Sequence, residues 1–549
     1  MRSRTELLLL IACCIFLLFY GLGAFGLLGA DEPRYAQVAR EMLDRGDVIT
    51  PTLNGKPWLE KPPLYYWQAM LSYRVGRAFL SAGPDENSLT GVTEQTARLP
   101  GAIDAALMIA AIYFFLRRFR PGTEIDAALI AASSAGIIGF AHAASTDMPL
   151  TASFTIALLA WYAWYENERK TNLAIFYFGL ALGMLAKGPI APALAAIIVI
   201  LFAAIKRDWR LIPRTLWLPG IALFFAISLP WYIAVQLRNP SFFRIFILEH
   251  NLARFSTNVY HHPQPFWFYL PVVLLAVMPW TLWLILALVE RLRLIGRERG
   301  EAFSSPDDHW VLFLLFWIVV PILFFSASQS KLPGYILPAV PAAALLIAEY
   351  LAERREREED QQSRISMAQA VVHAIFCGAL IFAAFAAPAV AYSRHLTFGP
   401  EIRFAAAVSA LLALGIAATL VMRAGRQMLR QVTILALILS VAIVIRFAAP
   451  AIDATQSSRP IAQAIQNFSR NPVPVALYHV GRTTQYGLDF YLNRPTQTYD
   501  SGEIPTEPHL LVAASNASTD FGTLLAGRKV SYLTSLPARK LELYWIGKK

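Results

Sequence analysis

Two adjacent carboxylates, Asp31 and Glu32, directly follow the first apolar stretch of the chain. Ionised groups are costly where a helix leaves a bilayer, so this pair favours a functional role over packing. A carboxylate here could accept a proton from the acceptor group of a transfer reaction, or orient that group. The alternative is that both are solvated residues at the start of a helix near Pro33, where the helix dipole favours negative charge.

Several cations and one tyrosine suit an anionic ligand. The turn EKPP holds Lys61 in a fairly fixed, extended backbone, because proline restricts the residue before it. Lysine binds phosphate as a point charge, although a lipid-headgroup anchor would look the same. Lys331 and Tyr335 flank a Pro-Gly break in QSKLPGYILP. Together with Lys61 and Arg254, these residues would surround an anionic headgroup with donors.

Asp147, in the stretch HAASTDMPL, stands beside an expected helix start. We include it with Asp31 and Glu32 as a candidate catalytic carboxylate. The alternative is an N-terminal cap for the helix that follows Pro149. Lys187 precedes a Gly-Pro pair, and we interpret it as a lysine whose ammonium group extends to the membrane interface.

A metal site is the open alternative to a cofactor-free reaction. Glu60 could join His250 and His262 to hold a divalent ion such as zinc. The spacing matches no standard metal motif, and histidines are common near lipid headgroups. We therefore expect no required cofactor.

The composition is that of a membrane protein. Of 549 residues, 56% are hydrophobic and only 15% are charged, and the mean hydropathy is +0.47. The net charge of +11 does not indicate nucleic acid, because most of the excess lies in alternate loops, as the positive-inside rule expects. All three cysteines fall within apolar runs, which favours neither a disulfide nor a thiol metal site.

The apolar runs predict about thirteen membrane spans, some of them shorter than the roughly 20 residues that a crossing needs, so that one or two are expected to be tilted, broken or merged. They lie near 7–29, 102–116, 125–141, 148–165, 172–186, 189–205, 215–235, 266–289, 310–326, 334–351, 368–392, 404–422 and 431–449. The basic loops are consistent with an N-terminus in the cytoplasm. The first loop (30–101), the loop 236–265 and everything after residue 450 then face outward. We expect the first span to be retained, because it is longer than the apolar core of a signal peptide.

Two helices must position the first-loop residues. Apolar side chains recur there with helical spacing, at Tyr35, Val38, Ala39, Met42 and Leu43. This pattern predicts an amphipathic helix lying in the membrane interface. A second helical stretch, from Leu64 to Leu80, carries aromatic residues favoured at headgroup depth. After Pro450, short apolar runs alternate with helical stretches, which predicts a small α/β domain.

The blocks GADEPRYAQVAREML, NGKPWLEKPPLYYW, STDMPLT, AKGPIAPAL, LEHNLARF and SKLPGYILPAVPA resemble the GT-C class of glycosyltransferases. They are most similar to its bacterial branch related to protein O-mannosyltransferases, and there to the lipid A 4-amino-4-deoxy-L-arabinose transferases. The resemblance covers roughly the whole chain. It implies an all-α polytopic membrane domain over residues 1–449 with a periplasmic first loop, followed by a small α/β periplasmic domain over residues 450–549.

The resemblance also implies a pentosyltransferase of the bacterial inner membrane whose active site and C-terminal domain face the periplasm. It would move 4-amino-4-deoxy-L-arabinose from undecaprenyl phosphate to a lipid A phosphate, giving resistance to polymyxin and other cationic peptides. Its partners would be the lipid-linked sugar donor, lipid A and membrane lipids, without nucleic acid. By position, Asp31 matches the acid of the class in the first loop. Lys61, with Lys331 or Tyr335, matches candidates for the carrier phosphate, and we place Arg254 and Tyr35 in the same set.

Three other functions remain open. Another polyprenyl-phosphate-sugar enzyme, such as a protein O-mannosyltransferase, would need Asp31 as a true base. A lipid flippase or transporter would place ionisable residues at mid-depth in its spans, whereas those here lie mostly at the ends. A non-enzymatic headgroup sensor would explain the basic residues but not the acidic pair.

Overall fold

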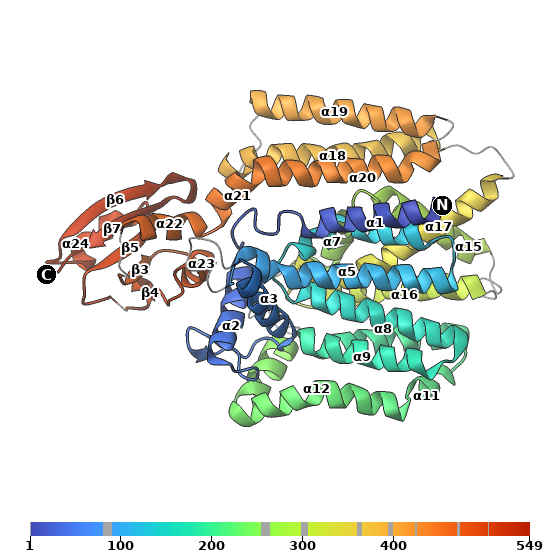
Figure 1. Ribbon diagram of the computed structural model, residues 1–549, viewed down its shortest axis with the longest axis horizontal. Coiled ribbons are helices and arrows are strands. Elements are labelled where there is room, and N and C mark those ends of the chain that lie inside the picture. Colours follow the sequence, from blue (N-terminus) through green and yellow to red (C-terminus); the bar gives the residue numbers. More distant parts are fainter. Residues whose placement is uncertain are drawn as a thin grey trace.

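The computed structural model of the protein describes residues 2–80, 91–253, 264–297, 306–359, 365–393, 399–422, 425–468, 473–502 and 504–548. Long helices run side by side and form the body of the molecule (Figure 1). At one end of this body lie two first-loop helices and a C-terminal sheet domain. We call this end the α2 end. The other end, where the short helix α11 (Leu211–Thr215) lies, we call the α11 end.

The body consists of the following helices, in chain order. They are α1 (Arg2–Phe19), α5 (Glu94–Phe119), α6 (Glu124–Ala132), α7 (Ala135–Ala141), α8 (Asp147–Asn167), α9 (Lys170–Lys187), α10 (Ile190–Lys206), α12 (Leu218–Arg238), η1 (Phe243–Ala253), η2 (Phe266–Phe268), α14 (Tyr269–Ala276), α15 (Thr281–Arg297), α16 (Pro306–Ala327), η3 (Pro333–Ala339) and α17 (Val340–Glu359). A second group lies beside them in Figure 1: α18 (Met367–Ser393), α19 (Pro400–Val421), α20 (Gly425–Ile443), η4 (Val444–Ala448) and α21 (Ala449–Gln456).

Within these described ranges, seven helices are long and apolar enough to cross a membrane, or up to nine if each of two bent pairs is one span. This confirms a polytopic helical membrane protein, with fewer clear spans than the thirteen predicted. Several predicted spans form helices that are less apolar than a typical crossing. For example, α8 contains Trp161, Tyr162, Trp164 and Tyr165, and α9 begins and ends at a lysine.

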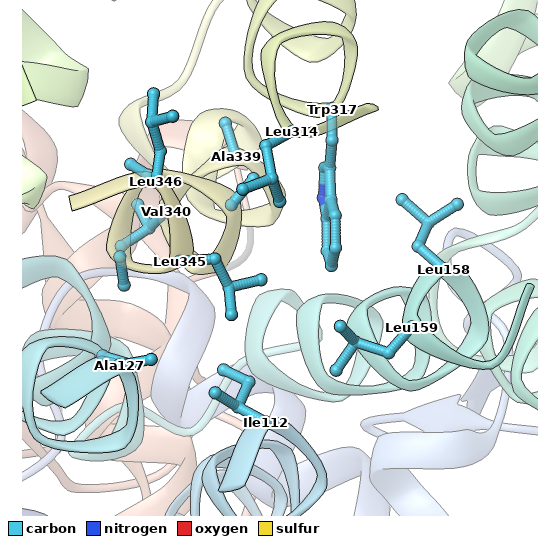
Figure 2. Close-up of a cluster of buried hydrophobic side chains, with 14 of the residues drawn as sticks. Ile112, Ala127, Leu158, Leu159, Leu314, Trp317, Ala339, Val340, Leu345 and Leu346 are labelled. Carbon is cyan, nitrogen blue, oxygen red and sulfur yellow. The ribbon is translucent and has the colours of Figure 1, made fainter. Parts of the chain in front are cut away.

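The main core lies where α5, α6, α8, α16 and α17 meet. Figure 2 shows Trp317 of α16 facing Leu158 and Leu159 of α8, with Leu314 of α16 and Leu345 of α17 on its other side. All five side chains are buried. The indole of Trp317 donates a hydrogen bond of 2.9 Å to the carbonyl of Pro338, so its polar atom is satisfied inside the core. This packing holds the ends of α8 and η3 in place at the α2 end.

The first loop forms two helices and a small hairpin: α2 (Asp31–Arg45), β1 (Thr52–Leu53), β2 (Lys56–Pro57) and α3 (Leu64–Leu80). The predicted amphipathic helix is present as α2, and its apolar residues Tyr35, Val38, Ala39 and Met42 are buried. Its position in the membrane interface stays a prediction, and protein also covers part of its polar side. The guanidinium of Arg40 donates to the carbonyl of Phe490 in the C-terminal domain, at 2.7 Å.

The C-terminal domain is the predicted α/β fold. Its elements are α22 (Arg459–Phe468), β3 (Val475–Tyr478), α23 (Arg482–Leu492), β4 (Gln497–Thr498), η5 (Tyr499–Ser501), β5 (His509–Ala514), η6 (Ala517–Asp520), α24 (Phe521–Leu524), β6 (Val530–Leu536), η7 (Pro537–Arg539) and β7 (Leu541–Ile546). The sheet order is β4-β3-β5-β7-β6. β3 pairs in parallel with β4 and β5, whereas β7 pairs antiparallel with β5 and β6.

Candidate active site

The first turn of α2 carries Asp31 and Glu32, and the two carboxylates have different surroundings. Glu32 is buried and accepts four hydrogen bonds. Two come from Arg98 of α5, at 3.1 Å from Nε and 2.8 Å from Nη2. The other two come from the backbone N–H groups of Leu28 and Ala144, each at 2.7 Å. Both oxygens of Glu32 are therefore engaged by protein donors.

Arg98 extends this network, and sequence reasoning missed it. Its side chain is fully buried, and besides Glu32 it donates to the carbonyls of Leu22, Phe25 and Gly26 at 2.8–2.9 Å. Because it stands at the start of α5, it joins the α1–α2 connection, α2 and the stretch before Asp147. A buried arginine in a membrane protein must have a partner, and the sequence signal for this one was its place near the end of the first loop (30–101).

Asp31 is more open: 55% of its side chain is exposed. It forms an ion pair with Arg34, one turn further along α2. The Arg34 guanidinium lies 4.8 Å from the ring centre of Trp58, 5.4 Å from that of Tyr35 and 5.5 Å from that of Tyr486. Because Tyr486 belongs to α23, the C-terminal domain contributes a wall beside Asp31.

Three buried tyrosines lie behind this pair. The ring centres of Tyr35, Tyr65 and Tyr66 are 6.0–6.2 Å apart. The hydroxyl of Tyr65 donates to the carbonyl of Ala97 at 2.8 Å. In the part of the chain that the structure describes, the hydroxyl of Tyr66 and the indole Nε1 of Trp58 have no hydrogen-bond partner, although both atoms are buried. Buried polar atoms of this kind need a partner, which a ligand can supply.

The charged groups near Tyr66 are Arg34, Glu60 and Asp31, which belong to the candidate site. Burial raises the pKa of Tyr66 more than the nearby Arg34 lowers it, and Glu60 and Asp31 raise it further. Burial likewise raises the pKa of Tyr35, with Asp31 contributing. Both hydroxyls are therefore protonated at neutral pH and can donate hydrogen bonds. Tyr35 is close enough to Asp31 to be affected by its charge, and its predicted role at the carrier phosphate stays a prediction.

A second cluster joins Asp147, Lys187 and Tyr335. Asp147 is the first residue of α8 and forms an ion pair with Lys187, the last residue of α9. The Lys187 ammonium lies 4.5 Å from the ring centre of Tyr335. The interpretation of Lys187 as only an interfacial lysine is therefore wrong, because its ammonium is bound within the protein. The close packing needs Gly334, since a Cβ there would lie 3.0 Å from Cγ of Asp147 and 2.8 Å from the ring of Phe140.

The other predicted phosphate ligands have different settings. Lys331 is buried, and its ammonium donates to the carbonyl of Ser328 at 2.6 Å. Burial lowers the pKa of Lys331. Lys61 is half-buried in the turn between β2 and α3. Arg254 lies outside the described residues, so its role stays a prediction.

The predicted metal ligands are only partly described. Glu60 and His250 approach each other, with 3.7 Å between Oε1 and Nε2. The third candidate, His262, lies outside the described residues. Among the residues that the structure describes, no group of three or more His, Cys, Asp or Glu side chains could hold a metal ion. A protein zinc site takes at least three protein ligands, so Glu60 and His250 would not suffice alone.

The C-terminal domain is fastened to the first loop by polar contacts. At the hairpin tip, the Asn54 amide donates to Asp489 at 2.9 Å. Glu41 accepts hydrogen bonds from Thr52, Asn54 and Gly55 at 2.7–3.1 Å, which fixes the same hairpin on α2.

Another contact lies at the base of the domain. The hydroxyl of Tyr491 donates to Glu94 at 2.9 Å and accepts from the backbone N–H of Leu27 at 2.8 Å. Together these contacts hold the C-terminal domain over the residues around Asp31.

Comparison with known proteins agrees with this architecture. The family model for dolichyl-phosphate-mannose-protein mannosyltransferases matches residues 86–233. An undecaprenyl phosphate-alpha-4-amino-4-deoxy-L-arabinose arabinosyl transferase of Pseudomonas aeruginosa (strain UCBPP-PA14) is 34% identical over 361 residues, which are 64% of this chain and 60% of that relative. The protein of the same name from Pseudomonas savastanoi pv. phaseolicola (strain 1448A / Race 6) is 33% identical over 66% of this chain and 64% of its own.

A solved structure matches over nearly the full length. The crystal structure of ArnT from Cupriavidus metallidurans bound to undecaprenyl phosphate has a TM-score of 0.74 and 22% sequence identity, and the match covers 98% of this chain and 97% of that one. The chain therefore has this fold from end to end, whereas its aligned part spans less than two thirds of the curated relatives above. The predicted resemblance to the GT-C glycosyltransferases, and among them to the aminoarabinose transferases, is confirmed.

Proposed function

We propose that this protein, which has the GT-C fold, is a membrane pentosyltransferase that moves 4-amino-4-deoxy-L-arabinose from undecaprenyl phosphate to a phosphate of lipid A. The observation that carries the proposal is the half-exposed carboxylate of Asp31, which lies near an aromatic wall and near buried donors that have no partner among the described residues. The names of the curated relatives support this sugar and this carrier. We place the reaction at the periplasmic face of the bacterial inner membrane, because the basic loops favour the opposite face for the cytoplasm.

The chemistry requires little proton transfer. The bond between the anomeric carbon and the carrier phosphate oxygen breaks, and its electron pair stays on the carrier phosphate. An oxygen of the lipid A phosphate forms the new bond to the anomeric carbon. Because phosphates are ionised at neutral pH, no strong base is needed. We assign Asp31 to orienting the acceptor or holding the ammonium group of the sugar.

Cations near a departing phosphate lower the barrier by stabilising its charge. We propose that Lys61 contacts the carrier phosphate. Lys187 and Tyr335 lie together beside Asp147, and this cluster, with Lys331 and Arg254, completes the proposed phosphate site. Tyr66 and Trp58 would donate hydrogen bonds to the sugar or the phosphate, which would satisfy the two buried donors that have no partner within the described ranges. Glu32 we assign to positioning α2, because its oxygens are already engaged by Arg98 and two backbone N–H groups.

The C-terminal domain would act by position rather than by chemistry. We propose that residues 1–449 form the transferase domain and residues 450–549 a periplasmic domain that shapes access to the site. The helical run Met428–Gln456 passes through this boundary without interruption. Because this helical run is continuous, a tilt of α20 would move the C-terminal domain with it.

The test is mass spectrometry of lipid A from cells with and without the gene. We expect aminoarabinose on lipid A phosphate only when the gene is present, together with resistance to polymyxin. A purified preparation supplied with the undecaprenyl phosphate-linked sugar and lipid A should make the same product. Transfer of a sugar to protein hydroxyls, with lipid A unchanged, would favour a protein O-mannosyltransferase-like enzyme. Movement of the intact lipid between leaflets without transfer would favour a flippase.

A further inference from the structure

A polar cavity lies at the α11 end of the helix body, away from the candidate active site. It has a volume of about 490 Å³. Its walls come from the end of α5, the last turn of α8, α11 and the start of α16. We call it the Trp164 pocket, after the indole at its wall, and its charged lining is Arg120, Glu166, Glu168, Asp208 and Arg214.

The Trp164 pocket and Asp31 belong to opposite faces of the membrane. α8 begins at Asp147, beside the candidate active site, and carries Trp164 close to its other end. At 1.5 Å per residue, the distance along the helix between them is about 25 Å. This length approaches the hydrocarbon thickness of a bilayer, about 30 Å. We therefore place the pocket at headgroup depth of the other leaflet.

The lining of the pocket carries charges of both signs. Arg120 pairs with Glu166 at 2.8 Å, and Arg214 pairs with Glu168 at 2.5 Å. Asp208 adds a third carboxylate. A purely anionic headgroup would meet three carboxylates here, and a purely cationic ligand would meet two guanidinium groups. A zwitterionic ligand can place its anionic group against the guanidinium groups and its cationic group against the carboxylates.

Trp164 points to a ligand independently of the charges. Its side chain is 2% exposed, and its Nε1–H has no hydrogen-bond partner among the residues that the structure describes. An indole N–H is a donor only, so it requires an acceptor such as a phosphate oxygen. The Lys170 ammonium and the Arg214 guanidinium carbon each lie 5.9 Å from its ring centre. These two cations already approach the aromatic ring.

We propose that the Trp164 pocket binds the headgroup of a zwitterionic phospholipid that carries a primary ammonium group, as in phosphatidylethanolamine. The phosphate accepts from Trp164 Nε1–H and the arginines, and the ammonium donates to Asp208 and Glu168. Because cations already approach the Trp164 ring, the pocket lacks the open aromatic cage that a quaternary ammonium prefers. A primary ammonium, with three N–H donors, matches carboxylates better. The proposal is independent of the transferase assignment.

The test is native mass spectrometry of the purified protein with phosphatidylethanolamine, phosphatidylcholine and phosphatidylglycerol of identical acyl chains. We expect phosphatidylethanolamine to bind about tenfold more tightly than either of the others, the ratio that one charge-assisted hydrogen bond supplies. Combining Asp208→Asn with Glu168→Gln should remove this preference and leave phosphatidylglycerol binding unchanged or stronger.

The control is Arg169→Gln, an exposed substitution on the same membrane face that does not line the pocket. It should keep the preference for phosphatidylethanolamine. Equal binding of all three lipids, or an intact preference in the double variant, would overturn the proposal. Equal affinity for water-soluble glycerophosphoethanolamine would overturn a membrane lipid as the source of the headgroup.

Discussion

At the scale of single residues, the candidate site separates two carboxylates that are neighbours in the sequence. Glu32 is enclosed by donors from three segments, whereas Asp31 stays half-exposed beside Arg34. A carboxylate whose oxygens are all occupied cannot also bind a substrate. The difference between them arises because successive helix residues point about 100° apart, so one faces α5 and the other faces the site.

We predict that Asp31→Asn abolishes sugar transfer while the protein is still made and inserted. The amide keeps the size of the side chain but removes the charge that would hold the sugar ammonium or orient the acceptor. The measurement is lipid A mass spectrometry in a strain that carries only the variant. Asp44→Asn, an exposed substitution on the same helix, is the matched control and should keep full activity. Near-normal transfer by Asp31→Asn would remove Asp31 from the site.

Lys61→Ala should weaken binding of undecaprenyl phosphate by about 1.5–3 kcal/mol, the range for a hydrogen bond to a charged group. The affinity of the purified variant for the carrier measures this directly. Lys56→Ala, at the exposed strand β2 of the preceding hairpin, is the control and should bind normally. An unchanged affinity in Lys61→Ala would show that the carrier phosphate lies elsewhere.

Tyr66 offers a comparison that separates function from stability. Its hydroxyl has no partner in the described part of the chain, so Tyr66→Phe should leave the unfolding temperature unchanged and reduce kcat/KM. Tyr73 is the control on the same helix, because its hydroxyl donates to the carbonyl of Ala36 at 3.2 Å. Tyr73→Phe should lose about 1 kcal/mol of stability and keep its activity once folded. A Tyr66→Phe enzyme with normal kcat/KM would contradict a role in substrate binding.

At the scale of elements, the buried Glu32–Arg98 pair determines where α2 starts. It ties α2 to α5 and, through Ala144, to the stretch before α8. This pair therefore holds Asp31 and Asp147 in relation to each other, although its hydrogen bonds involve neither of their carboxylates. We regard Arg98 as a positioning residue.

Arg98→Met should cost about 3–5 kcal/mol of stability, because it leaves the Glu32 carboxylate buried without its cation. Adding Glu32→Gln in the same chain should recover part of the stability. If the Arg98–Glu32 pair positions Asp31, the double variant should regain stability but not kcat. If the pair has a purely structural role, the double variant should regain both stability and kcat. Arg118→Met, at the exposed last turn of the same helix, should change neither.

The elements of the fold were largely predictable, and the contacts between them were not. Helical periodicity located α2, and alternation of strands and helices located the C-terminal domain. Nothing in the spacing indicated that Lys187 pairs with Asp147, because the partners lie at the ends of two antiparallel helices 40 residues apart. Arg98 and Tyr486 were not predicted as site residues for the same reason, since each becomes part of the site only through tertiary packing.

At the scale of the whole molecule, the membrane body, the first loop and the C-terminal domain meet at one end (Figure 1). The hairpin between α2 and α3 is held on one side by Glu41 and on the other by Asp489. Its base is held by Trp231, whose indole donates to the carbonyl of Ile49 at 3.0 Å. A movement of this hairpin would have to break contacts with both the membrane body and the C-terminal domain.

We predict that residues 46–62 become protected from hydrogen exchange when undecaprenyl phosphate binds, whereas residues 504–548 change little. The reason is that a loop over an active site orders when its substrate arrives. Undecaprenol, which lacks the phosphate, is the control ligand and should give no protection. Protection confined to the C-terminal domain would make that domain the carrier site.

The contact between Arg40 and Phe490 also has a consequence for biosynthesis. The two residues are 450 positions apart in the chain. At a synthesis rate of about 5–20 residues per second, the first loop is made roughly 20–90 seconds before its partner domain exists. During that interval Arg40 and Arg34 lack Phe490 and Tyr486. The first loop therefore lacks these contacts until the C-terminal domain is made, and a ribosome that stalls before residue 480 leaves a product without Tyr486 and Phe490.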